Sequence, residues 1–155
     1  MILIFIFIGM AVILLDNASV YMNTKKIKSG LNLSVKAAAL AINEDEQLAE
    51  GIFTIDQDQA EVNFKQILSE NIGLNVITFE PLPTGSLLTE KPEIKEFIVQ
   101  NITPATYYSP ALKNSFTFEH PSVVAVIRVK VKGVFSSRII TMYKLSSSQL
   151  TSVYE

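Results

Sequence analysis

The sequence has no cysteine and only one histidine in 155 residues. Without cysteine the chain can form no disulfide, no thiolate nucleophile and no cysteine-ligated metal site, and one imidazole cannot make a histidine cluster. Neither a phosphate-binding glycine loop, nor paired catalytic carboxylates, nor a Ser-His-Asp order stands out. We therefore expect a protein that is not an enzyme and that holds no cofactor and no metal.

Proline is missing from the first eighty residues, and all six prolines lie at or beyond Pro81. Because proline interrupts helices, this distribution predicts helices in the first half and strands and turns in the second. Acidic residues gather between positions 44 and 70 and basic residues between positions 120 and 155, while the formal net charge is −2. This asymmetry disfavours nucleic acid as a partner and allows one end of the molecule to attract the other end of a neighbour.

The chain opens on the apolar run MILIFIFIGMAVILL, which contains no charged residue. As a helix this run would span roughly 22 Å, less than the roughly 30 Å of membrane hydrocarbon, so a full span must extend through Asp16 to about Met22. No basic residue precedes the run, and helix-forming sequence follows it, unlike a cleaved signal peptide. We expect this segment to be retained.

The apolar pattern continues beyond the run at the spacing of one helix face. Its members are Ile27, Leu31, Val35, Ala38 and Ile42, widened by Leu33, Ala37 and Leu40. One helix is predicted to reach about Glu50 and to stop at Gly51. We expect residues 1–24 to form a transmembrane or filament-core segment, and residues 25–155 to form a globular head.

The head is predicted to contain a second helix and a sheet. Asp56 is placed to cap this helix, with Gln59 three residues later, and Gly73 is placed to end it. Strands are predicted at Leu74–Leu82, Glu93–Asn101, Ser122–Lys132 and Arg138–Leu145, the last two as an antiparallel hairpin, with a further strand at residues 114–120. The expected fold is α+β and pilin-like: the amphipathic half of a long helix packed on an antiparallel sheet of about four strands, with the apolar half protruding.

Asp16 is the costly residue of the apolar segment, because an ionised carboxylate in hydrocarbon needs a partner or a place near the interface. Two interpretations stay open. Asp16 marks the membrane boundary, or it pairs with a base or a free amino terminus on an adjacent subunit. A second open question concerns Arg128, Lys130 and Lys132, which form either a solvated strand face or a contact for a neighbour's acidic region.

Three N-x-S/T triplets begin at Asn17, Asn32 and Asn101. The first two fall on the predicted long helix, which is a poor acceptor context compared with a surface loop. Asn101 is therefore the expected glycosylation site, if the host has the machinery.

The stretch from residue 6 to residue 42 resembles type IV pilins and, more closely, the TadE/TadG-like pseudopilins of Flp (Tad) pilus systems. In that family an apolar run ends in an acid, an aromatic residue follows, and an alanine-rich helix comes next; here these are Asp16, Tyr21 and VKAAALAI. The leader peptide of pilins has no counterpart in the sequence, and the fifth residue is Phe5 rather than an acid. Either Met1 is the mature start and Asp16 replaces that acid, or the likeness is architectural.

The resemblance implies a structural subunit of an extracellular filament, a helical homo-oligomer whose subunits lie in the membrane before assembly. The residues expected to contribute to assembly are Phe5, Ile8, Leu14, Leu15, Asp16, Tyr21, Lys25 and Lys26. The alternative is a single-pass accessory protein of a pilus or secretion system that binds a partner without polymerising. A third reading, a membrane-anchored enzyme, would require a deep pocket with convergent polar groups.

The basic residues that follow the apolar run bear on which side of the membrane the head lies. Lys25, Lys26 and Lys28 follow the apolar run with no base before it, and the positive-inside rule would then leave the head in the cytoplasm. A leader removed before Met1 would supply the missing positive charge and place the head outside.

Overall fold

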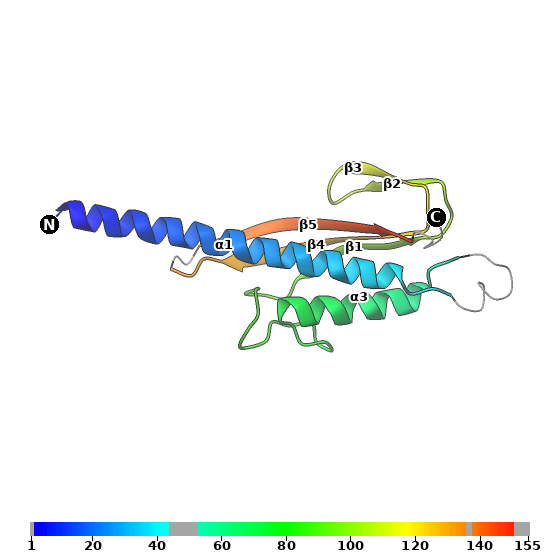
Figure 1. The fold of residues 1–155 in the computed structure, drawn as a ribbon, viewed down its shortest axis with the longest axis horizontal. Coiled ribbons are helices and arrows are strands. Elements are labelled where there is room, and N and C mark those ends of the chain that lie inside the picture. The colour runs from blue at the N-terminus through cyan, green and yellow to red at the C-terminus, as the bar shows by residue number, and fades with distance from the viewer. Residues whose placement is uncertain (1, 44–52, 136–137, 151–155) are drawn as a thin grey trace, which may run out of the picture.

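The computed structural model describes residues 2–43, 53–135 and 138–150. Its two helices are α1 (Ile2–Ala39) and α3 (Gln57–Ile72), and its strands are β1 (Glu93–Gln100), β2 (Ala105–Ser109), β3 (Asn114–Phe118), β4 (Ser122–Lys132) and β5 (Ile139–Gln149). The α+β class predicted from the sequence is confirmed. Figure 1 shows α1 running along the sheet and extending beyond it at the N-terminal end.

α1 ends at Ala39, so the prediction that it continues to about Glu50 is wrong. Beyond Ala39 the chain forms backbone bonds with the segment before α3: Asn43 N donates to Thr54 O at 2.9 Å, and Asp56 N donates to Ala41 O at 2.7 Å. These bonds replace the hydrogen bonds that a longer helix would have made. The predicted stop at Gly51 lies outside the described residues.

The predicted limits of the second helix are confirmed. Asp56 caps α3, because its side chain accepts a hydrogen bond from Gln59 N at 2.9 Å. Gly73 follows α3 with φ 76°, in the left-handed region that glycine adopts without strain, and its N–H donates to Ser69 O.

The main sheet has three antiparallel strands in the order β1-β4-β5 and not the expected four. The β4–β5 hairpin is confirmed, with Lys132 opposite Ile139. Leu74–Leu82 was predicted as a strand but forms a turn, because the Asn75 side chain accepts hydrogen bonds from Ile77 N and Thr78 N. The extra strand at residues 114–120 exists as β3, but it pairs with β2 in a separate two-stranded sheet.

α1 and α3 pack against each other, and α1 also packs on β4 and β5. The core between these layers includes Ile27, Leu31, Val35 and Ala38 of α1, Phe64, Leu68 and Ile72 of α3, and Val123, Ala125, Ile127, Val129 and Val131 of β4. The predicted stripe of α1 is confirmed over these four residues. Leu33 and Leu40, expected to widen it, are exposed, whereas Ser34 and Ala39 are buried.

The opposite face of the sheet is partly covered. Val124 and Val126 alternate along β4 with the residues that face the helices, yet both are fully buried, whereas Lys132 at the end of the strand is exposed. Ser109 Oγ and Ala111 N, at the turn between β2 and β3, donate to Glu96 Oε1 at 2.9 and 2.8 Å. Figure 1 shows this hairpin on the side of the main sheet away from α3.

Candidate functional site

The N-terminal part of α1 is apolar and exposed on all sides. The large apolar side chains between Ile2 and Leu15 range from 37% exposed at Val12 to 81% at Leu3. Four predicted assembly residues, Phe5, Ile8, Leu14 and Leu15, belong to this segment, and all four are exposed. By length and composition α1 could cross a membrane, since its best window of 18 residues has a mean hydropathy of 2.3 and none of that window is buried.

Asp16 lies where this exposed segment first meets the head. Its Oδ1 accepts a hydrogen bond from Phe135 N at 2.9 Å, which joins α1 to the turn between β4 and β5. A groove beside this contact is lined by Val12, Ile13, Asp16, Asn17, Val20, Arg138 and Ile140. The carboxylate is thus engaged by a backbone donor of its own chain.

Gly133 makes room for the Asp16 carboxylate. A Cβ atom at position 133 would lie 2.6 Å from Asp16 Cγ, far inside van der Waals contact. Gly133 N also donates to Arg138 O at 3.2 Å, which closes the turn. The absence of a side chain at this position therefore allows helix and hairpin to meet at Asp16.

The remaining predicted assembly residues lie one to three turns further along α1. Tyr21 is exposed, and Lys25 Nζ sits 4.8 Å from the centre of its ring, in a cation–π arrangement. Lys26 is exposed as well. The structure brings Tyr21 and Lys25 together and leaves Lys26 on the surface.

Polar side chains fasten the following turns of α1 to β5. Thr24 Oγ1 lies 3.5 Å from Met142 Sδ, Lys28 Nζ donates to Leu145 O, and Ser146 Oγ donates to Asn32 Oδ1 at 2.8 Å. Burial, and to a lesser degree the charge of Lys144, holds the pKa of Lys28 below its usual range. These contacts fix the direction in which the apolar segment leaves the head.

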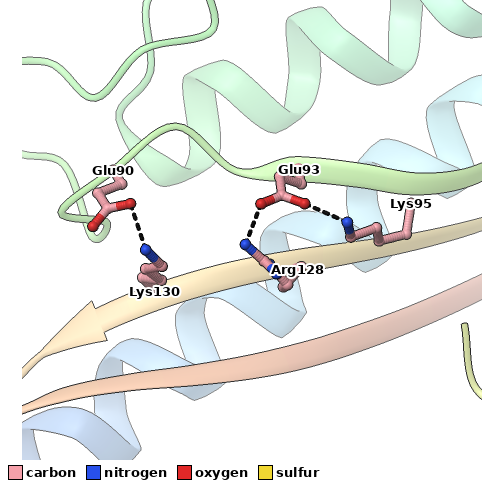
Figure 2. A network of polar contacts seen from close by, with 5 residues as sticks. All are labelled: Glu90, Glu93, Lys95, Arg128 and Lys130. Atoms are coloured by element: carbon pink, nitrogen blue, oxygen red, sulfur yellow. Dashed lines mark hydrogen bonds and ion pairs between the residues drawn. The ribbon is translucent and has the colours of Figure 1, made fainter.

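Two basic residues of β4, Arg128 and Lys130, face acidic residues of their own chain (Figure 2). Glu93 forms ion pairs with Arg128 and Lys95, and Glu90 Oε2 lies 2.7 Å from Lys130 Nζ. The hydrogen bond from Lys95, together with the charge of Arg128, lowers the pKa of Glu93. Arg128 and Lys130 are therefore already paired, which weakens the expectation that they bind a neighbour's acidic region.

Asn101 joins the end of β1 to the segment before α3. Its Oδ1 accepts from Ile55 N at 2.8 Å, and its Nδ2 donates to Ile55 O at 2.9 Å. A glycan would be attached at this same Nδ2. The amide thus has a structural role, and glycosylation of Asn101 stays a prediction.

The hydroxyl of Tyr107 in β2 interacts with the carboxylate of Glu96 in β1. Burial, followed by the charge of Glu96 and a hydrogen bond to it, raises the pKa of Tyr107. Over the part of the chain that the structure describes, no three acidic or histidine side chains gather as a metal site. Asp56 and Asp58, two acidic residues close in sequence, belong to the cap and the first turn of α3.

Gly133, Val134 and Phe135 are the residues of this site that sequence reasoning missed. Gly133 was assigned only to the turn of the hairpin. The available signal was the apolar pair Val134 and Phe135 at a position where turns are usually polar. Only the fold places this turn beside Asp16.

Comparison of the chain with protein-family models, with curated proteins and with solved structures gives no match.

Proposed function

We propose that this protein is a structural subunit of an extracellular pilus-like filament, held in the membrane by α1 before assembly. The observation that carries the proposal is the division of α1 into two parts. Its N-terminal segment is apolar and exposed on all sides, whereas its C-terminal half is buried against α3 and the sheet. The resemblance of the first 42 residues to pilins and TadE/TadG-like pseudopilins supports the same function.

An apolar rod of this kind is stable only where water is excluded. Lipid provides such an environment, and so do copies of the same rod, because the hydrophobic free energy scales with the apolar area removed from water. Many exposed apolar side chains on one protruding helix exceed what the surface of a soluble monomer normally carries. In the proposed filament these helices form the core and the heads form the outer layer.

Head-to-tail contacts that do not close into a ring would generate a helical polymer. Phe5, Ile8, Leu14 and Leu15 would face neighbouring helices in the core. Such packing requires no pocket and no catalytic group, in keeping with a structural protein.

The alternative function is a single-pass accessory protein that binds its partner without polymerising. One observation favours it: Asp16 already has a backbone partner, Phe135 N, in its own chain. The carboxylate then has no requirement for a base on an adjacent subunit, and α1 would serve as an anchor alone.

Removal of residues 1–15 separates the filament proposal from a head that polymerises by itself. The shortened chain retains Asp16 and the buried half of α1, so we expect a soluble monomer by sedimentation velocity, with the full-length chain as the control. Filaments formed by the shortened chain would contradict the proposal.

A further inference from the structure

The described part of the turn between β4 and β5 has two exposed apolar side chains, Val134 and Phe135, which together are called the β4–β5 tip. Val134 is 65% exposed and Phe135 is 59% exposed. On the neighbouring part of α1, Leu14 and Leu15 are exposed as well. The hydrogen bond between Phe135 N and Asp16 Oδ1 holds the two regions at the same level along the helix axis.

The length of α1 relates this tip to a membrane. About 20 helical residues are needed to cross roughly 30 Å of hydrocarbon, whereas Ile2–Leu15 covers only about 21 Å at 1.5 Å per residue. A span that begins at Ile2 must therefore extend to about Tyr21. Asp16 would then lie roughly 8 Å inside the level of Tyr21 by the same helical rise.

The residues at Tyr21 have the character of a membrane interface. Tyrosine is enriched at the headgroup level, and lysine side chains reach from there toward water. Tyr21 and Lys25 form such a pair, with Lys25 Nζ 4.8 Å from the ring centre.

We propose that the β4–β5 tip enters the lipid interface beside α1 and carries Val134 and Phe135 into the membrane. This inference rests on the part of the proposed function that places α1 in a membrane. The occupant is lipid, because the hydrogen bond between Phe135 N and Asp16 Oδ1 holds the tip beside the segment of α1 that would span the bilayer. The tip also supplies Asp16 with a hydrogen-bond donor at a depth where an unpaired carboxylate would be penalised.

The absence of cysteine from the sequence allows a direct test by single-site labelling. Phe135→Cys carries an environment-sensitive fluorophore in full-length protein reconstituted into phosphatidylcholine vesicles that contain nitroxide-labelled lipids. Ile8→Cys reports on α1, and Ile102→Cys, 83% exposed beyond the far end of β1, is the water-exposed control. We expect about a twofold loss of fluorescence at positions 135 and 8, as for probes within the membrane, and little change at position 102.

The three positions distinguish the possible failures. Quenching at position 8 without quenching at position 135 would overturn the inserted tip and leave the membrane-spanning helix intact. No quenching at position 8 would overturn the membrane-spanning helix and the inserted tip with it. Val134→Cys serves as a second probe of the tip, and cross-linking of either tip cysteine to a second copy without quenching would assign the tip to a protein contact and overturn the proposal.

Discussion

Asp16 joins the apolar part of α1 to the head through contacts that include the hydrogen bond from Phe135 N and the close approach to Gly133. The sequence identified Asp16 as costly, but its partner is a backbone N–H 119 residues away in the chain. No local pattern carries that information, because the contact depends on how far the β4–β5 hairpin extends along α1. Gly133 could be recognised from the sequence as a turn residue, whereas its close approach to the Asp16 carboxylate could be recognised only from the fold.

The Asp16–Gly133 contact predicts that mutations at these two positions have coupled effects on the free energy of unfolding. Asp16→Ala removes the acceptor of Phe135 N and should lower the free energy of unfolding by about 1 kcal/mol. Gly133→Ala should cost about 1–3 kcal/mol in the natural chain because of overlap with the carboxylate, and distinctly less in the Asp16→Ala background. Urea unfolding of the four proteins in detergent micelles measures this coupling. Asp16→Asn, which retains an oxygen acceptor, is the control, and additive effects would contradict the contact.

Asn101 predicts a second effect of a single residue. Asn101→Ala breaks both hydrogen bonds to the Ile55 backbone and leaves the N–H and C=O of this buried residue without the Asn101 partner, so we expect a loss of about 1–3 kcal/mol in the free energy of unfolding. Asn101→Asp keeps the acceptor for Ile55 N and loses the donor, so its loss should be smaller. Denaturant unfolding checks the order, and an Asn101→Ala variant as stable as the natural chain would contradict this role.

At the scale of the elements, local signals were sufficient where they acted over a few residues. The Asp56 cap and the Gly73 stop set the limits of α3, and alternating apolar residues located β4. Local signals were insufficient where the limits or the existence of an element depend on partners that are distant in the sequence. α1 ends early because backbone groups near Ala41 bond to the segment before α3, and β2 was not predicted because it depends on its pairing with β3.

Gly30 allows α1 and α3 to approach closely. A Cβ at this position would lie 2.9 Å from Ile72 Cγ2 and 3.1 Å from Asn71 Cβ. Alanine gains about 1 kcal/mol of helix propensity over glycine, but overpacking costs about 1–3 kcal/mol, so Gly30→Ala should be neutral to destabilising. Ser29→Ala, on the exposed face of the same helix, is the control for propensity. A clear increase of stability for Gly30→Ala in thermal unfolding would show that the helices are less tightly packed.

The ion pairs between β1 and β4 predict a small pH dependence. Glu93 has a lowered pKa in the folded chain, so its stabilising effect is present above the ordinary carboxyl pKa and is lost as the pH falls through the lowered value. Glu93→Gln should therefore be slightly less stable at neutral pH, and the difference should shrink in acid. Urea unfolding across the acid range measures it, with Glu80→Gln, an exposed carboxylate before β1, as the comparison. An equal difference in stability between Glu93→Gln and the natural chain at every pH would show that the ion pairs do not cause it.

At the scale of the whole molecule, hydrophobic patterning was enough to predict a long helix with an exposed apolar end and an α+β head. The number of strands in the main sheet was not predictable, because Leu74–Leu82, which has the composition of a strand, forms a turn, and β3 pairs with β2 in a separate sheet. The placement of the β4–β5 turn on α1 gives the molecule a second apolar element next to its helical rod. The head therefore carries an apolar turn beside the exposed part of α1, which a helix that served only as an anchor would not require.

We propose that the exposed segment of α1 assembles this chain into a filament. The direct test is negative-stain electron microscopy of material sheared from cells, together with intact-mass measurement of the subunit. The proposal predicts uniform fibres composed mainly of this chain. Retention of the chain in the membrane fraction, with no fibres in the sheared material, would contradict it and favour the anchored accessory protein.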